Sequence, residues 1–330
     1  MGAVKAIPDY SALEGLRSRY LGCLIGLAIG DAMGAPVEGL QRGSFTPITG
    51  FRSGGPHQLE AGQWTDDTSM ALCLAESLVE KRSFDARDQM ERYRRWFREG
   101  YLSSTGEAFG YGATMKRALD RFDAWGVPYV GDSSDLSASN GSLMRVAPIP
   151  MFFRADPAVA LRYARDSSRT THANVVVLET CQYLTALIIK ALNGADKEEV
   201  LFGDLSLVPG FQGRTSLETF ARHLKSLWYR QPAEDMEPDA YVLDTLACAL
   251  WALSESTTFE EGLLLAVNLG GDADTVGAVY GQIAGSIYGL AGLSRALLDE
   301  LWASEPISAV AESMLKLARE PDAGWLTLNP

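Results

Sequence analysis

Two short segments of this chain concentrate carboxylate and hydroxyl side chains in a pattern that suits divalent metal ions. The first reads Thr65-Asp66-Asp67-Thr68 and the second reads Asp272-Ala-Asp274-Thr275, each beside glycine and each at the start of a helical pattern. Mg²⁺ and Mn²⁺ prefer hard oxygen ligands, so two such clusters that face one another could bridge a pair of ions. No Cys/His set with the spacing of a zinc site competes with this hypothesis.

Each segment also has a simpler interpretation. Thr or Asp at the start of a helix accepts backbone N–H groups that have no partner within the helix, and acidic residues suit the positive end of the helix dipole. Four carboxylates and two hydroxyls are more than two helix caps need, however. Helix capping and metal binding therefore both remain hypotheses for these segments.

Four further places carry groups that suit a substrate. Glu38 follows a proline that stops a helix from continuing, so it is expected in a loop, where a surface glutamate is the simplest interpretation. The segment Gly110-Tyr-Gly112 precedes a helix and would direct backbone N–H groups at an anion, although no complete phosphate-binding motif is present. Ser139–Arg145 also leads toward a helix, but its Asn-Gly pair is common in simple turns. His172 could contact a ligand, although a lone histidine is more often structural.

The elements that must position these residues are predicted to be helices. Most of the chain has apolar residues at helical spacing, and no strand–helix alternation or short hairpin turn occurs, which predicts an all-α fold. A capping box at Ser11–Glu14 starts a helix that continues to about Ile29. Without a long linker, residues 1–330 are expected to form one domain. The other expected helices are 67–81, 85–98, 112–123, 142–153, 158–166, 173–193, 216–228, 240–254, 258–269, 274–290, 294–302 and 307–318.

Two of these helices carry glycine at every fourth position. The first has Gly22, Gly26, Gly30 and Gly34, and the second has Gly277, Gly281, Gly285 and Gly289. A glycine inside a helix costs about 1 kcal/mol relative to alanine, so eight of them need a packing reason, which a close approach of two backbones provides. A membrane-spanning interpretation is weaker, because Asp31 interrupts the first run and Gln282 and Ser286 interrupt the second.

The composition narrows the range of partners. The 29 Lys+Arg and 42 Asp+Glu residues give a net charge of −13, which argues against general binding to nucleic acid or to an anionic membrane. The Arg92–Arg98 segment alternates basic and aromatic residues, but helical spacing places the aromatic residues on one face, which predicts an amphipathic helix. Four widely spaced cysteines and no apolar signal segment at the N-terminus predict a cytoplasmic protein with reduced thiols.

In their order, the motifs resemble those of the ADP-ribosylglycohydrolase family, which contains dinitrogen-reductase-activating glycohydrolase and the ADP-ribosylhydrolases of the same helical fold. The matching motifs are Gly30-Asp31-Ala32 with Glu38, Trp64–Thr68, Asn140–Arg145, Thr171-His172 and Gly270–Gly277. The match spans about residues 17–290, and the two Asp clusters in this order are specific. The segment after about residue 295 carries no recognisable motif.

The resemblance implies a compact all-α domain with two Mg²⁺ or Mn²⁺ ions in a cleft. The metal ligands that it implies are Thr65, Asp66, Asp67, Asp272, Asp274 and Thr275. Catalytic roles are expected for Glu38, a mobile glutamate near the metals in this family, and for the metal-site residues Asp67 and Asp274. The residues expected to hold the diphosphate and riboses of the substrate are Gly110, Gly112, Asn140, Gly141, Ser142 and His172. Ser139 departs from the glycine that is usual there, which bears on the fit of that loop.

The expected reaction is hydrolysis of the glycosidic bond between ADP-ribose and a modified side chain, with the arginine guanidinium favoured. Two divalent cations would reverse the local sign of an acidic site that otherwise repels the diphosphate, and they would assist an oxocarbenium-like transition state. Alternatives are serine-linked ADP-ribose, O-acyl-ADP-ribose or another small ADP-ribosyl conjugate. A non-catalytic protein that binds or blocks an ADP-ribosylated partner is a further alternative, although such a relative would be expected to have lost an aspartate.

Overall fold

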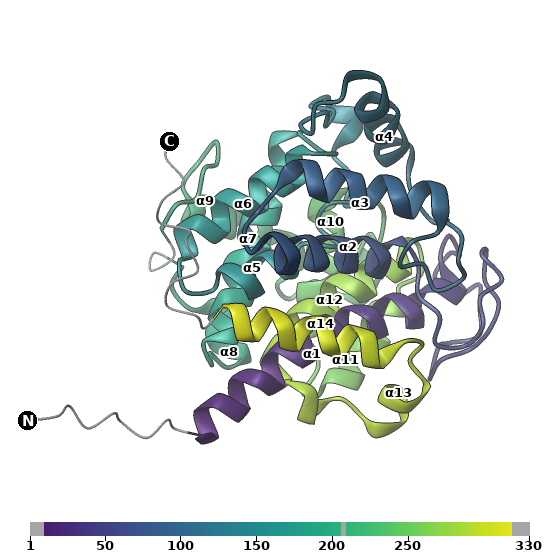
Figure 1. Ribbon diagram of the computed structural model, residues 1–330. Helices are drawn as coiled ribbons and strands as arrows, with labels where there is room; N and C mark the ends of the chain where they lie inside the picture. Colours follow the sequence, from purple (N-terminus) through teal and green to yellow (C-terminus); the bar gives the residue numbers. More distant parts are fainter. Residues whose placement is uncertain (1–9, 206–208, 319–330) are drawn as a thin grey trace, which may run out of the picture.

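A computed structural model describes residues 10–205 and 209–318, and this part of the chain consists of helices joined by turns, without a strand (Figure 1). The all-α prediction is confirmed. The α-helices are α1 (Tyr10–Gly34), α2 (Asp66–Lys81), α3 (Ala86–Glu99), α4 (Ala113–Trp125), α5 (Pro148–Phe153), α6 (Pro157–Arg169), α7 (Val175–Leu192), α8 (Lys197–Phe202), α9 (Leu217–Trp228), α10 (Val242–Ser254), α11 (Phe259–Val267), α12 (Ala273–Tyr288), α13 (Arg295–Glu300) and α14 (Ser304–Leu317). Short 3₁₀ helices are η1 (Ala35–Val37), η2 (Asp135–Ser137), η3 (Ala233–Asp235) and η4 (Leu290–Gly292). The prediction that the chain has no N-terminal signal segment rests on residues that lie mostly outside the described part of the chain, so it stays a prediction.

Most predicted helices are present with ends that differ by a few residues, but the N-terminal capping box is wrong. α1 begins at Tyr10, so Ser11 lies inside the helix, and α1 continues past the expected end at Ile29 as far as Gly34. The sequence pattern does not predict the short helix α8. Its first turn is stabilised by Asp196, whose carboxylate accepts a hydrogen bond from a backbone N–H.

The predicted helix over 142–153 is wrong in its first half, because the segment before Pro148 forms turns. Pro148 has no N–H, so the carbonyl of Met144 cannot accept the helical hydrogen bond from it. That carbonyl instead accepts from Nε2 of Gln282 at 2.6 Å, and Oε1 of Gln282 accepts from the Ala147 N–H at 2.9 Å. A side chain of α12 therefore replaces the missing helical bonds and anchors this loop.

The two glycine runs form one seam between α1 and α12, as the sequence predicts. We call this the glycine seam; it consists of Gly22, Gly26, Gly30 and Gly34 of α1 and Gly277, Gly281, Gly285 and Gly289 of α12. A methyl group added at Gly26 would lie 2.5 Å from the carbonyl oxygen of Gly281, well inside van der Waals contact. Gly22 opposes Gly285 and Gly34 opposes Ala273, so the helices run antiparallel, and the C-terminal end of α1 meets the N-terminal end of α12.

The glycine seam lies inside a large hydrophobic core. α1, α7, α10 and α12 contribute many of its fully buried side chains, and α14 packs across α1 and α2 (Figure 1). By length and composition alone, the segment Leu13–Val37 and helix α7 could each cross a membrane, but the most apolar 18-residue window of the segment is 100% buried inside the protein and that of α7 is 83% buried. Burial in the core accounts for their apolar character. One domain for residues 1–330 stays a prediction.

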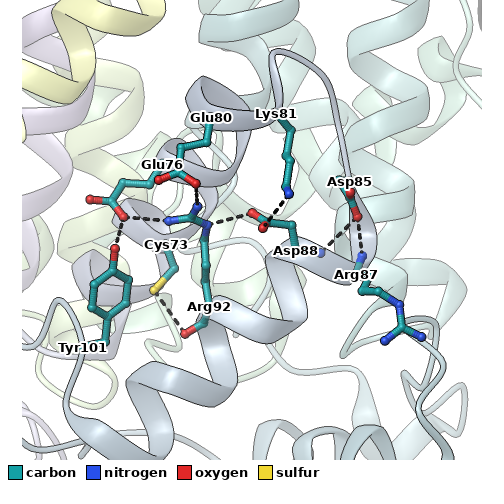
Figure 2. Close-up of polar contacts among 9 residues, drawn as sticks. All are labelled: Cys73, Glu76, Glu80, Lys81, Asp85, Arg87, Asp88, Arg92 and Tyr101. Atoms are coloured by element: carbon teal, nitrogen blue, oxygen red, sulfur yellow. Dashed lines mark hydrogen bonds and ion pairs between the residues drawn. The ribbon is translucent and has the colours of Figure 1, made fainter.

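A buried arginine joins α2 to α3 (Figure 2). The guanidinium of Arg92 on α3 donates to Glu76 at 2.9 Å and to Glu80 at 2.5 Å on α2, and to Asp88 of its own helix at 2.8 Å. The apolar face of α3, including Tyr93, is buried as predicted for an amphipathic helix. Arg92 does not share the exposed face of the other arginines of α3. Three carboxylates compensate its charge and so offset the free-energy cost of burying it.

All four cysteines are buried and free, as the sequence predicts. Burial raises the pKa of each thiol. The pKa of Cys181 is raised to about 11, because hydrogen bonds to Ser142 and Ser168 oppose part of the effect of burial. The thiols therefore act as small apolar core groups rather than as nucleophiles.

Gly26→Ala tests the glycine seam. The added methyl group meets a backbone carbonyl that cannot rotate away, so we expect a loss of stability of about 1–3 kcal/mol or more. Gly15→Ala is the matched control in the same helix, since its methyl group would have only the Arg19 guanidinium nearby, at 3.6 Å; it should be neutral or stabilising by up to about 1 kcal/mol. Urea denaturation measures both, and equal stability of the two variants would contradict the close backbone contact.

Candidate active site

A cavity of about 530 Å³ opens where the N-terminal ends of α2, α4 and α12 converge. This volume is sufficient for a ligand of nucleotide size. Most of the predicted site residues line it: Glu38, Asp66, Asp67, Gly110, Gly112, Asn140, Gly141, His172, Asp272, Asp274 and Thr275. Thr65 does not line the cavity but lies fully buried, with its hydroxyl 3.2 Å from Oδ2 of Asp67 and 3.4 Å from Oδ2 of Asp274.

The start of α2 is capped by a residue of another helix. Thr65 stands at the N-cap position, yet its side chain makes no capping hydrogen bond. Asp31 of α1 instead accepts from the N–H of Thr65 at 2.8 Å, and from the N–H and hydroxyl of Thr68 at 3.0 and 2.6 Å. Asp272, the N-cap residue of α12, also makes no capping hydrogen bond. Helix capping therefore does not account for the Thr/Asp clusters.

The carboxylates form two groups that share one residue. Oxygens of Asp31, Asp67 and Asp274 lie within 4.8 Å of one another, and so do oxygens of Glu38, Asp272 and Asp274. Oδ1 of Asp67 and Oδ1 of Asp274 are buried without any hydrogen-bond partner. Buried oxygens without a partner are unfavourable, so these two atoms fit the ligand positions of cations.

The electrostatics of the cluster favour the same interpretation. Burial raises the pKa of Asp66, Asp67 and Asp274 well above the usual range, and repulsion from neighbouring carboxylates raises it further. Burial also raises the pKa of Asp31, to about 6, against hydrogen bonds from the backbone and from Thr68. Two divalent cations would offset this repulsion, and the all-oxygen donor set suits Mg²⁺ or Mn²⁺. The residues present therefore fit a centre for divalent cations.

Glu38 is held beside the carboxylate cluster by backbone hydrogen bonds of the segment that follows it. The N–H of Gly39 donates to the Gly271 carbonyl at 2.7 Å, and the Gly271 N–H donates back to Leu40 at 2.8 Å. This pairing holds the segment after η1 against the turn before Asp272. The surface interpretation of Glu38 is therefore wrong, because its carboxylate lies in the cavity wall, where Nε2 of His57 contacts it at 2.8 Å.

The cavity wall also includes an uncapped helix end. Gly112, at the N-cap of α4, has no side chain to satisfy the first N–H groups, and Gly112, Ala113 and Thr114 all line the cavity. Gly110 has φ +83°, and a methyl group there would collide with Oδ1 of Asp66. Glycine is therefore required at position 110, and free N–H groups with the positive helix end can receive an anion.

The Asn140 loop supports the carboxylate cluster. Nδ2 of Asn140 donates to Oδ2 of Asp272 at 2.7 Å and to the Thr245 hydroxyl at 2.8 Å, so this amide already orients an aspartate. Ser142 does not line the cavity; its hydroxyl lies 2.7 Å from that of Ser168 in the protein interior. The structure thus brings Asn140 to the cavity but not Ser142.

His172 and Gly141 meet in the cavity wall. A methyl group on Gly141 would lie 3.0 Å from Cε1 of His172, so the absence of a side chain lets the ring edge approach. Burial, and next the charge of Arg145, lower the pKa of His172 to about 3, which keeps the imidazole neutral at physiological pH. His172 can therefore act as a neutral hydrogen-bonding group toward a ligand.

Several residues of the site are not assigned a role by the sequence motifs. Asp31 carries one signal, because it is the single charged residue in the apolar second half of α1, from Tyr20 to Gly34. His57 contacts Glu38, and its ring lies 5.0 Å from that of Phe109 at a tilt of 50°, in a loop without any recognisable pattern. Met70 and Met115 form an apolar part of the wall, which becomes visible only because they share one hydrophobic cluster in the fold.

The fold and the cavity define an all-helical protein in which clustered carboxylates and an uncapped helix end line the same cavity. Residues 12–324 match the model of the ADP-ribosylglycohydrolase family. The ADP-ribosylarginine hydrolase Tri1 of Pseudomonas putida is 37% identical over 92% of this chain and 80% of its own, and Tri1 of Serratia proteamaculans is 34% identical over 96% and 83%. A solved structure described as an ADP-ribosylglycohydrolase-related protein complex superimposes with a TM-score of 0.80, at 43% identity over 92% of this chain and 99% of that one.

The chain belongs to the ADP-ribosylglycohydrolase family. It is an enzyme of the glycosidase class that acts on ADP-ribosyl linkages.

Addition of Mg²⁺ tests the carboxylate cluster. In metal-free protein the pKa of Asp66, Asp67 and Asp274 is higher folded than unfolded, so these groups favour folding at low pH and oppose it as the pH rises through the raised values. Mg²⁺ should therefore raise the melting temperature more at pH 7.5 than at pH 5.5. At a Mg²⁺ concentration of 100 times its Kd, binding at one site raises the free energy of unfolding by about 2.7 kcal/mol.

The matching variant is Asp274→Asn, which removes the carboxylate common to both groups. We expect its metal-free form to melt no lower than the parent protein and to lose the Mg²⁺-dependent shift. Asp244→Asn is the control, because Asp244 belongs to a separate acidic group with Glu237 and Asp239. A full shift in Asp274→Asn, or its loss in Asp244→Asn, would place the cation elsewhere.

Proposed function

We propose that this enzyme releases ADP-ribose from modified arginine side chains in a reaction that requires two divalent cations. The observation that carries the proposal is a single cavity that is lined both by the carboxylate cluster and by an uncapped helix N-terminus. The reacting ribose would lie at the carboxylates and the diphosphate at the start of α4. The Tri1 relatives, which are named ADP-ribosylarginine hydrolases, support the linkage.

The cavity mouth supports a cationic leaving group. Asp239 lines the cavity, and its carboxylate lies within 4.8 Å of those of Glu237 and Asp244. Burial, and next the charges of Asp239 and Glu237, raise the pKa of Asp244 to about 6. A guanidinium would relieve this repulsion, whereas a serine linkage brings no positive charge.

The protein residues divide the work of the reaction. Bound at the aspartates, divalent cations would supply positive charge that holds ribose hydroxyls and polarises water. Glu38 moves the proton, as the base for the attacking water or the acid for the departing group. Asn140 holds Asp272 in its orientation, and the glycines at 110 and 112 leave space for a phosphate to reach the N–H groups of α4.

Glu38→Gln separates binding from turnover. The amide keeps the size of the side chain and a contact to His57 but cannot exchange a proton, so kcat should fall by about 10²–10⁴-fold. The Kd for ADP-ribose, measured by calorimetry with Mg²⁺, should change only a few-fold. Glu60→Gln, an exposed glutamate of the same loop, is the control and should retain full activity. Lost affinity with normal kcat would make Glu38 a binding residue.

A side-by-side assay on arginine- and serine-ADP-ribosylated substrates with Mg²⁺ tests the linkage. We expect faster release from arginine, and Asp239→Asn should reduce kcat/KM for the arginine substrate by about 2–5-fold, the range of one exposed charge interaction, while leaving serine unchanged. Asp299→Asn, remote from the cavity lining, is the charge-matched control. A preference for serine would overturn the linkage, and cleavage of neither substrate would overturn the proposed activity.

A further inference from the structure

Arg145 is a buried cation without a carboxylate partner. Only 1% of the residue is exposed, and among the described residues no Asp or Glu forms an ion pair with it. Its Nη1 lies 3.7 Å from Sδ of Met70 and 3.9 Å from Sδ of Met115, its guanidinium carbon lies 4.5 Å from the centre of the Tyr93 ring, and its Nε has no acceptor. Arg92, the other buried arginine, has three carboxylates around it (Figure 2).

A buried charge without a counter-ion is unfavourable, so its place calls for a reason. Arg145 lies directly behind the cavity wall, since Met70 and Met115 touch its guanidinium on one side and line the cavity on the other. The backbone on both sides of it is anchored by Gln282, which binds the carbonyl of Met144 and the N–H of Ala147. The guanidinium is therefore held in a fixed position next to the cavity.

One hydrogen bond connects this cation to the cavity. Nη2 of Arg145 donates to Oγ1 of Thr171 at 2.7 Å, and the same oxygen lies 2.8 Å from Nδ1 of His172. A guanidinium has only donors, so the hydroxyl proton of Thr171 cannot be directed to it. Among the described residues, Nδ1 of His172 is the one other hydrogen-bond partner of this hydroxyl, so the buried hydroxyl proton finds an acceptor only if Nδ1 is unprotonated.

The neutral ring of His172 then carries its own proton on Nε2. That nitrogen lies 3.1 Å from Oγ of Ser139, and both residues line the cavity. We propose that Arg145, acting through Thr171, fixes His172 as an Nε2–H donor to an oxygen of the bound ADP-ribose. Arg145 and Thr171 are positioning residues in this scheme, and neither touches the substrate. The identity of the ligand rests on the proposed function, whereas the tautomer of His172 does not.

The tautomer is measurable without substrate. Two-bond ¹⁵N–¹H correlation spectra of ¹⁵N-histidine-labelled protein at pH 7 distinguish a protonated Nε2 from a protonated Nδ1. His172→Gln assigns the signal among the three histidines of the chain. We expect the wild-type protein to show only the Nε2–H form. Thr171→Val, which keeps the side-chain shape but removes the hydroxyl, should give a mixture of tautomers, and Thr171→Ser should restore the Nε2–H form.

Calorimetry with ADP-ribose and Mg²⁺ measures the consequence for binding. Thr171→Val should weaken binding by about 2–10-fold, the range of the net contribution of one typical hydrogen bond, and Thr171→Ser should restore it. Arg145→Met, which fits the methionine-lined space, should resemble Thr171→Val. A protonated Nδ1 in the wild-type protein, or an unchanged tautomer in Thr171→Val, would overturn the relay. A shifted tautomer with unchanged affinity would overturn the contact to ADP-ribose, and failure of the wild-type protein to bind ADP-ribose would overturn the proposed function while leaving the tautomer result intact.

Discussion

Direct backbone contact between α1 and α12 is the constraint on which the rest of the site depends. Side chains of ordinary size would separate two helices by 8–10 Å, but the glycine seam lets carbonyl groups of one helix touch the other. The two helices are antiparallel, so the C-terminal end of α1 meets the N-terminal end of α12. Asp31 at the end of α1 and Glu38 in the segment after it therefore lie close to Asp272 and Asp274. The carboxylates that converge on the cavity are therefore positioned by the least reactive residue type in the chain.

Helix N-termini and backbone donors help the protein to tolerate several buried acids in one place. Three helices direct their N-terminal ends at the cavity, and the positive end of a helix dipole stabilises nearby negative charge. The carboxylate of Asp31 accepts three hydrogen bonds at the start of α2. Asp67 and Asp274 each keep one oxygen without a partner. The carboxylate of Asp31 therefore has a structural role, whereas those of Asp67 and Asp274 leave positions for a ligand. Oxygens of these three residues lie within 4.8 Å of one another.

The sequence predicts the parts of this site that depend on local pattern. Helical periodicity predicts the all-α fold, and the clustered aspartates indicate oxygen ligands before any contact is known. Roles that depend on tertiary contacts do not follow from local pattern. Asp31 caps a helix that starts 35 residues later, and Ser142 lies in a motif yet faces the interior. The turns before α5 require Gln282 from the far end of the chain, which no local pattern reveals.

The two buried arginines show why charge counting along the sequence is a poor guide to electrostatics. Arg92 lies in a strongly basic segment, but three carboxylates surround it, and its interactions serve only to join α2 to α3. Arg145 has no other basic residue beside it in the sequence, yet it lies behind the cavity wall without a carboxylate partner among the described residues. Besides burial, its charge contributes to the lowered pKa of His172. In a chain with a net charge of −13, this buried cation behind Met70 and Met115 adds positive charge beside a cavity that the clustered carboxylates make acidic. Positive charge beside the cavity suits an anionic ligand, as does the uncapped N-terminal end of α4.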